Sequence, residues 1–146
     1  MSETANKAAI ERFYHQLWNR WDLAAADEIV SEDIRFRGSL GSTLEGRESF
    51  KGYVETVRAA FPDWHNRIDE MISCGDRVVT RMTWSGTHSG RLQDVEPTGE
   101  RVEYVGAAIF RLKEGKIIEG WVVGDTQEYP LRSALSVPTL TVTAVK

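Results

Sequence analysis

Asp125 is the residue of this chain whose type and position most directly suggest chemistry. It ends an apolar run, residues 117–124, that has the composition of a β-strand. Successive side chains of a strand point to opposite faces, so the pattern places Asp125 on the same face as Trp121 and Val123. A carboxyl group in an apolar interior is suited to proton transfer. Asp125 is therefore a candidate acid–base catalyst, and the alternative is a carboxylate at a strand end that caps a turn or pairs with an arginine.

Arg81 is the expected partner of an interior Asp125. It lies in phase with Val79 and Thr83 on a second predicted strand, residues 76–88. A buried arginine needs a partner, because an unpaired buried charge is costly. The pair could serve as a base and as a cation that stabilises a developing oxyanion. It could equally be a structural ion pair, and the residues alone leave both interpretations open.

Among the three histidines, His88 is the best candidate for an auxiliary catalytic group. It falls out of phase with Arg81, but a bulge at Gly86 would turn it inward. His65 is expected to have a polar packing role, and His15 is expected to face solvent or the rim of a pocket. The histidines are far apart in the sequence, and no cluster of His, Asp and Glu has the spacing of metal ligands. We therefore expect no metal site.

Length, charge and cysteine content limit the class of protein. The chain has 146 residues, enough for one domain with a substantial core. Its net charge is −4 with no basic stripe, which argues against nucleic acid, and no apolar run approaches membrane-spanning length. The N-terminus does not have the order of a secretory signal, and the single Cys74 cannot form an internal disulfide. We expect a cytoplasmic protein with one domain, residues 1–135, and a tail, residues 136–146, that is an added strand, a dimer contact or disordered.

Hydrophobic periodicity predicts helices first and strands afterwards. Apolar residues recur at helical spacing over residues 4–21, and two further helices are expected over 23–30 and 47–61, the last ended by Pro62. Strands are expected over residues 34–37, 65–73, 76–88, 101–113 and 116–125. This order predicts an α+β fold in which three N-terminal helices pack inside a curved, mostly antiparallel sheet. Such a cone has a natural pocket for a small molecule at its mouth.

Short motifs occur in a fixed order along nearly the whole chain. They are Trp18-Asn19 and residues 44–48, 61–63, 75–81, 86–90 and 97–99, with Asp125 after the run 116–121. In these motifs the chain resembles the SnoaL-like polyketide cyclases, also called ester cyclases, of the nuclear transport factor 2-like (cystatin-like) superfamily. The resemblance implies the same α+β cone.

The resemblance also implies a cofactor-independent enzyme that closes a ring by intramolecular aldol condensation. In such cyclases an aspartate on the last long strand is the acid–base catalyst, and Asp125 stands at that place. Some cyclases add a histidine on the preceding strand, but residues 104–111 contain none. The limonene-epoxide hydrolases of the same superfamily have an arginine and an aspartate two positions apart. Here Arg81 matches the arginine and Thr83 stands in place of the aspartate, which argues against epoxide hydrolysis.

We therefore expect a cyclase or isomerase that acts on a small, apolar, polyketide-like carbonyl compound. Asp125 would move a proton next to the carbonyl group, Arg81 would stabilise the oxyanion, and His88 would assist. The alternatives are a hydrolase or dehydratase on the same frame, or a non-catalytic small-molecule-binding module.

Six further residues are candidates for contact with a small apolar or aromatic ligand, although core packing is the alternative for the aromatic ones. They are Trp18, Tyr53, Thr83, Ala107, Ile109 and Trp121. No cofactor is expected. The resemblance implies a homodimer formed through the outer face of the sheet.

Overall fold

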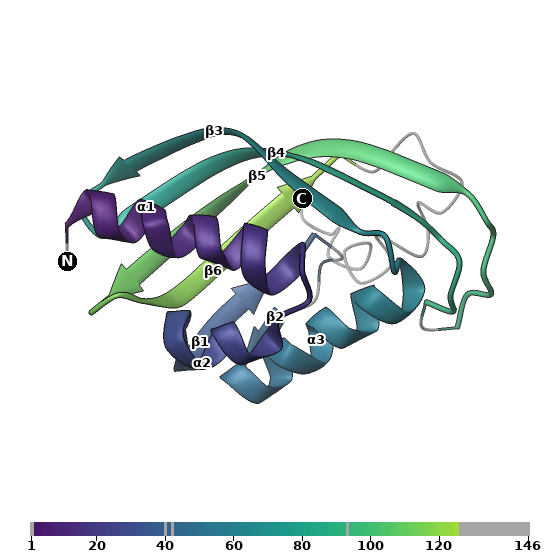
Figure 1. Cartoon of the computed structure of the whole chain (residues 1–146), viewed down its shortest axis with the longest axis horizontal. Helices are drawn as coiled ribbons and strands as arrows, with labels where there is room; N and C mark the ends of the chain where they lie inside the picture. The colour runs from purple at the N-terminus through teal and green to yellow at the C-terminus, as the bar shows by residue number, and fades with distance from the viewer. Residues whose placement is uncertain (1, 40, 42, 93, 126–146) are drawn as a thin grey trace, which may run out of the picture.

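The computed structural model describes residues 2–39, 41, 43–92 and 94–125 (Figure 1). The tail expected at residues 136–146 lies outside these ranges. Within them, helices lie on the concave side of a strongly curved sheet (Figure 1). This arrangement confirms the predicted α+β architecture.

The three predicted helical regions are present. The first is α1 (Glu3–Arg12), which continues as a π-helical stretch, η1 (Phe13–Trp18). The Oγ atom of Ser2 caps α1 by accepting a hydrogen bond from the amide of Ala5 at 3.0 Å. The second region is shorter than predicted and consists of a 3₁₀ turn, η2 (Leu23–Ala25), and α2 (Ala26–Ile29). The third is α3 (Arg47–Ala60), which ends before Pro62 as expected.

Among the described residues, six strands form one sheet in the order β2-β1-β6-β5-β4-β3. Their bounds are β1 (Val30–Arg37), β2 (Thr43–Glu45), β3 (His65–Cys74), β4 (Arg77–Thr87), β5 (Arg101–Lys113) and β6 (Lys116–Gly124). Of these strands β1 and β6 pair in parallel, and the other neighbours are antiparallel. β1 begins earlier than predicted, and the short β2 was not predicted.

A β-bulge in β6 decides which of its side chains face the helices. Leu112 of β5 pairs with Ile117, but its neighbour Arg111 pairs with Glu119, so Ile118 is an extra residue. An extra residue reverses the facing of every side chain beyond it. Ile117 is buried before the bulge, and after it the buried positions are Gly120 and Val122.

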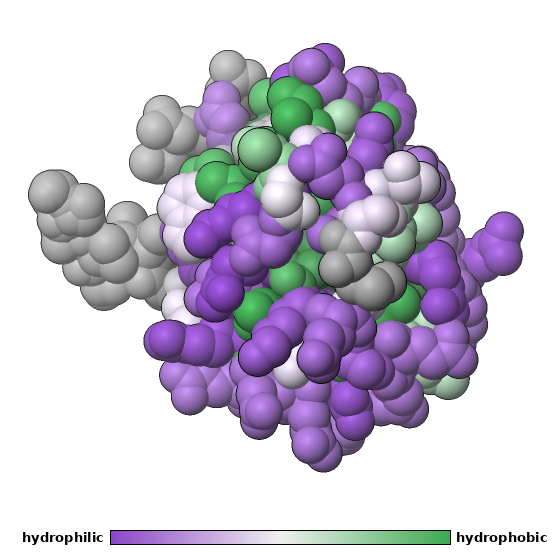
Figure 2. Space-filling model, turned by 90° about the vertical axis from the view of Figure 1, so that its left-hand side faces the viewer, coloured by the Kyte–Doolittle hydropathy of each residue, from purple (hydrophilic) through white to green (hydrophobic). Residues whose placement is uncertain are grey.

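The core lies between the inner face of the sheet and the helices. The even-numbered residues of β4 and β5, from Val78 to Trp84 and from Val102 to Phe110, face inward and are mostly buried. By contrast, the end of the molecule that carries the start of α1 and the β3–β4 and β5–β6 turns is largely hydrophilic (Figure 2). Apolar residues show at this end only in small patches (Figure 2).

We predict that Gly106→Ala destabilises the protein while Gly52→Ala does not. A Cβ at Gly106 would lie 2.0 Å from the Val123 carbonyl oxygen and 2.7 Å from the Trp84 ring. Overpacking of this kind typically costs about 1–3 kcal/mol of unfolding free energy. Gly52 is the control, because a Cβ there meets nothing within 4 Å and alanine favours a helix by about 0.5–1 kcal/mol. Urea denaturation measures both variants, and equal midpoints for them would contradict the inner packing at Gly106.

Candidate functional site

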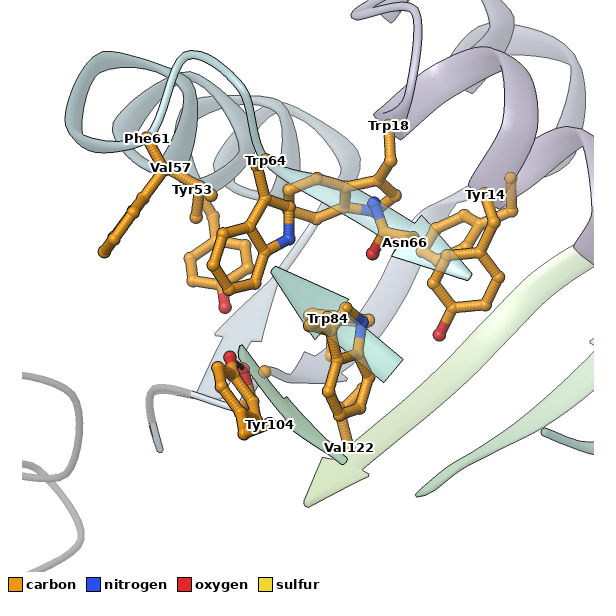
Figure 3. Close-up of a pocket in the computed structure, with 14 residues that line it drawn as sticks. Tyr14, Trp18, Tyr53, Val57, Phe61, Trp64, Asn66, Trp84, Tyr104 and Val122 are labelled. Carbon is orange, nitrogen blue, oxygen red and sulfur yellow. Dashed lines mark hydrogen bonds between the residues drawn. The ribbon is translucent and has the colours of Figure 1, made fainter. Parts of the chain in front are cut away.

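A narrow cavity lies between the helices and the inner face of the sheet (Figure 3). Its walls come from η1, α3 and the strands β1, β3, β4, β5 and β6. The fourteen lining residues are Phe13, Tyr14, Trp18, Phe36, Gly38, Ser39, Tyr53, Val57, Phe61, Trp64, Asn66, Trp84, Tyr104 and Val122. The volume open to the centre of a water molecule is about 30 Å³, enough for about two waters. A larger ligand must therefore displace side chains as it enters.

Aromatic rings in edge-to-face and tilted contacts form most of the cavity wall. Trp18 meets Tyr53 edge to face with ring centroids 6.0 Å apart. Tyr104 contacts Trp84 at 5.4 Å and Trp64 at 5.9 Å. Such contacts are favourable beyond the area that they bury. The cavity is thus a space that favours a flat, largely apolar molecule.

Few polar groups reach this cavity. The hydroxyl groups of Ser39 and Tyr104 lie 3.0 Å apart and form a hydrogen bond in which either can be the donor. Asn66 is 3 % exposed and is held by Asn19, whose Oδ1 accepts from the backbone amide of Asn66 at 2.8 Å. Burial raises the pKa of the Tyr14 hydroxyl, so this group stays neutral. None of the described residues in the lining carries a carboxylate, an amine, a guanidinium or an imidazole.

The structure corrects the predicted position of Asp125. It lies exposed just beyond β6, and its amide donates to the Val105 carbonyl at 2.8 Å. The bulge at Ile118 is the cause, because Trp121, Val123 and Asp125 all follow it and share the outer face. The prediction that Asp125 lies deep in the cavity is therefore wrong.

Arg81 also lies on the outer face and not in the cavity. Its Nε is 3.4 Å from Glu70 Oε1, and its Nη1 is 4.0 Å from Asp69 Oδ2. The predicted meeting of Arg81 with Asp125 inside the cavity is wrong, because both side chains project from the convex side. Arg81 was assigned to the inner face as the partner of Asp125. The wrong facing assigned to β6 therefore led to the wrong facing for β4.

Thr83 is buried, but by polar neighbours on the outer face and not by a ligand pocket. Its hydroxyl donates to Asp69 Oδ2 at 2.6 Å and accepts from Arg67 at 3.1 Å. Arg67 Nε also donates to Asp69 Oδ1 at 2.7 Å. The hydrogen bonds to Asp69, first from Thr83 and then from Arg67, lower the pKa of this carboxyl group. The prediction that Thr83 lines the pocket is wrong because Thr83, like Arg81, is an odd-numbered residue of β4 and faces outward.

The remaining candidates for ligand contact divide into two groups. Ala107, Ile109 and Trp121 face outward, and Ile109 and Trp121 are 39 % and 48 % exposed, so their placement in the pocket wall was wrong. Trp18 and Tyr53 do line the cavity (Figure 3). Their part in binding a ligand stays a prediction.

His88 is fully buried at the far end of β4 but does not line the cavity. It needs no bulge at Gly86, because even-numbered residues of β4 already face inward. Its ring lies 5.4 Å from that of Phe61, and its Nδ1 accepts from the Thr98 amide at 3.3 Å. Nδ1 is thus an acceptor, and the proton of the neutral ring lies on Nε2. The geometry gives His88 a role in holding the loop that contains Thr98.

Sequence reasoning missed the polar residues that do reach the cavity, Ser39, Asn66 and Tyr104. Ser39 follows a strand in a loop, and a single asparagine or tyrosine on a strand carries no distinctive pattern. One available signal was Trp18-Asn19, because Trp18 lines the cavity and Asn19 bonds to Asn66. Among the described residues, no three His, Cys, Asp or Glu side chains gather as metal ligands.

Comparison with known families agrees with this fold. The family model of SnoaL-like polyketide cyclases matches residues 8–129. No curated protein sequence matches the chain. Within the described ranges, no helix is both long and apolar enough to cross a membrane.

Solved structures with the same fold cover nearly the whole chain. AclR from Streptomyces galilaeus, a proposed hydroxylase, is 30 % identical with a TM-score of 0.75, over 92 % of this chain and 97 % of that one. IdmH from Streptomyces antibioticus, a proposed polyketide cyclase, is 26 % identical with a TM-score of 0.71, over 96 % and 99 %. A proposed SnoaL-like polyketide cyclase from Jannaschia sp. CCS1 is 22 % identical with a TM-score of 0.81, over 93 % and 94 %. The fold is the nuclear transport factor 2-like fold.

We predict that His88 makes the protein less stable as the pH falls from 7 to 5. Burial lowers the pKa of His88 from its ordinary 6.5, against weaker opposing effects of Gly90 and Glu100. The unfolded chain therefore binds a proton at a higher pH than the folded chain does. The contribution of neutral His88 to the unfolding free energy is fully present above pH 6.5. It is lost as the pH falls through the pKa that His88 has in the folded protein.

The check is urea denaturation of the wild type and of His88→Asn at several pH values between 7 and 5. Asparagine keeps an acceptor for the Thr98 amide but does not titrate. The variant should be less stable overall, because it leaves a cavity, but its unfolding free energy should vary less with pH. An equal slope in both proteins would contradict the assignment.

Proposed function

We propose that this chain, which belongs to the SnoaL-like polyketide cyclase family, is a cofactor-independent cyclase or isomerase of a small, flat carbonyl compound. The observation that carries the proposal is the aromatic cavity with its few convergent polar groups. A cytoplasmic location is part of the same proposal. Family membership supports the reaction class, and the cavity supports the kind of substrate.

Ring closure needs an enolic carbon and a carbonyl carbon held together with water excluded. Aromatic walls supply both conditions, because they restrict a flexible chain to folded conformations and leave little room for solvent. Positioning of this kind can contribute a large share of a rate enhancement. The new carbon–carbon bond uses the enol electrons, the enol oxygen loses its proton, and the attacked carbonyl oxygen gains one. The product is therefore an isomer of the substrate, and no oxidant or cofactor is consumed.

The hydrogen-bonded hydroxyls of Ser39 and Tyr104 are the groups that we assign to this proton transfer. A hydroxyl both donates and accepts, so the pair can take the enol proton and deliver another to the carbonyl oxygen. The 3.0 Å between the two oxygens is within the range for such a relay. This role replaces the interior aspartate, because no carboxylate belongs to the described part of the cavity wall.

We predict that Tyr104→Phe lowers ring-closure turnover by roughly 10²-fold, the lower end for acid–base groups. Asp125→Asn should leave turnover within about two-fold of wild type, since proton transfer by a positioned group requires hydrogen-bond reach. Conversion of linear β-polyketone esters to the cyclic isomer, followed by chromatography, measures both variants. A large loss in Asp125→Asn with none in Tyr104→Phe would restore Asp125 as the acid–base catalyst and end the relay assignment.

A non-catalytic binding module is the second candidate function. The observation that favours it is the neutral character of the described cavity lining, which lacks a strong base. Binding of the same esters without any turnover by the wild type would support this function over the first. The epoxide-hydrolase alternative has no such support, because Arg81 and Thr83 lie on the outer face.

We also propose that the protein forms a homodimer through the outer face of the sheet. A row of exposed apolar side chains crosses four neighbouring strands there. Register pairs Ile72 with Val79, Val79 with Ile109, and Ile109 with Trp121. These four are 37–56 % exposed, and Val123 and Val105 extend the same surface. A contiguous apolar surface of this kind is typical of a protein interface.

We predict that Trp121→Glu shifts the protein from dimer to monomer, because it places a charge in the centre of this apolar row. Sedimentation velocity at several protein concentrations measures the change. Ala8→Glu, which adds the same charge at an exposed position of α1, is the control and should remain dimeric. A wild type that is monomeric at all concentrations would disprove the proposal.

A further inference from the structure

We propose that the side-chain oxygen of Asn66 accepts a hydrogen bond from a hydroxyl group of the ligand, so that the cavity selects enols and phenols. The inference rests on the proposed function, since it names the chemical form of the substrate for the same site. It concerns one polar atom of the cavity wall whose orientation the surrounding hydrogen bonds determine.

Asn66 belongs to β3, and its side chain is part of the cavity wall (Figure 3). Three hydrogen bonds join it to Asn19, which follows η1. The backbone amide and Nδ2 of Asn66 both donate to Asn19 Oδ1, at 2.8 and 3.0 Å. In return, Asn19 Nδ2 donates to the Asn66 carbonyl at 2.9 Å. These three hydrogen bonds, the Asn19–Asn66 bracket, attach the end of the first helical region to the sheet.

The bracket allows only one orientation of the Asn66 amide. Asn19 is itself oriented, because its Oδ1 faces a backbone amide and its Nδ2 faces a backbone carbonyl. If the Asn66 side chain were flipped, its Oδ1 would face Asn19 Oδ1, and two acceptors would repel each other. The Nδ2 of Asn66 therefore faces Asn19, and its Oδ1 faces the cavity.

This oxygen has no partner within the part of the chain that the structure describes. Asn66 is 3 % exposed, and no described side chain or backbone group donates to its Oδ1. Its neighbours in the cavity wall are mostly aromatic (Figure 3). The oxygen faces the cavity, so a ligand that brings a donor can bond to it and gains affinity relative to a ligand that displaces water without replacing its hydrogen bond.

The acceptor character of the oxygen defines the ligand class. An amide oxygen accepts but never donates, so a ketone, ether or ester oxygen cannot pair with it. An enol or a phenol can. For a substrate with several β-dicarbonyl units, this contact favours an enol at the unit beside Asn66, while the enol that attacks in ring closure gives its proton to the Ser39–Tyr104 pair. The same contact also suits a phenolic product.

The test uses a matched pair of probes, 2-naphthol and 2-methylnaphthalene, which differ in a hydroxyl against a methyl group. Protein labelled with ¹⁵N at the tryptophan indoles is titrated with each probe. Trp18, Trp64 and Trp84 line the cavity, whereas Trp121 lies on the outer face and is the internal reference. We expect the cavity indole signals to shift and that of Trp121 to stay.

In wild type, 2-naphthol should bind about 3- to 10-fold more tightly than 2-methylnaphthalene, the range for one neutral hydrogen bond. Asn66→Leu keeps the backbone bonds to Asn19 and removes the acceptor, so it should reverse this order, because the methyl compound is the more apolar. Asn6→Leu is the matched control, since Asn6 is 2 % exposed but bonds to Gly75 away from the cavity. It should keep the wild-type order.

The outcomes separate the inference from the proposed function. If neither probe shifts the cavity indoles, binding in this cavity is disproved, and the inference falls with it. If both probes bind and wild type does not prefer 2-naphthol, the inference alone is overturned. The wild-type comparison decides this even if Asn66→Leu does not fold. A preference that survives in a folded Asn66→Leu would overturn it as well.

Discussion

The single extra residue in β6 controls the facing of the strand on which the cavity is built. Ile118 has no partner on β5, and beyond it the strand presents Gly120 and Val122 to the helices. β6 pairs with both β1 and β5, so it lies in the middle of the sheet. Without the bulge, Trp121 and Val123 would point into the cone, and Asp125 would follow them. A bulge thus keeps the largest side chain of β6, Trp121, on the outside.

The small inward residues of the sheet leave room for aromatic rings from other elements. A Cβ at Gly120 would lie 2.6 Å from the ring of Phe36, and one at Gly124 would lie 2.6 Å from the ring of Tyr104. These rings rest directly on the strand backbone and form the cavity wall. The volume that a side chain on β6 would have filled is instead filled by groups from β1 and β5. The shape of the cavity is therefore a consequence of the bulge and of the glycines that follow it.

The order and type of the elements could be predicted from the sequence, because helical and strand periodicities are local. The three helical regions, the four long strands and the architecture follow from them. The facing of the strands could not be predicted in the same way. Asp125 was placed inside on the basis of strict alternation along residues 117–125, and Arg81 was placed inside as its partner. One unpaired residue reverses that alternation. Nothing local in residues 116–120 marks Ile118 as the extra residue, since the mismatch exists only against β5.

The site residues were hard to predict for a different reason. Trp18 and Tyr53 stand on helical stripes, and helical periodicity identifies their face reliably. Asn66 gains its meaning from Asn19, which is 47 residues away in the sequence. A hydrogen-bond bracket over such a separation leaves no spacing to recognise. The resemblance that included Trp18-Asn19 pointed to the correct place but not to its partner.

The distribution of charge supports a mechanism that depends on position and hydrogen bonding. Ionised groups pair on the outer face, where Arg67 and Thr83 stabilise the Asp69 carboxylate, and Arg111 and Glu119 form a second pair. The described wall of the cavity contains only neutral groups. A charged base in this apolar space would lose solvation and would need its own buried counterion. An enolic substrate removes that need, because it arrives with the acidic proton already on oxygen. A hydroxyl relay is then sufficient to move the proton of the attacking enol as the ring closes, and the fixed amide acceptor holds a second hydroxyl group of the substrate.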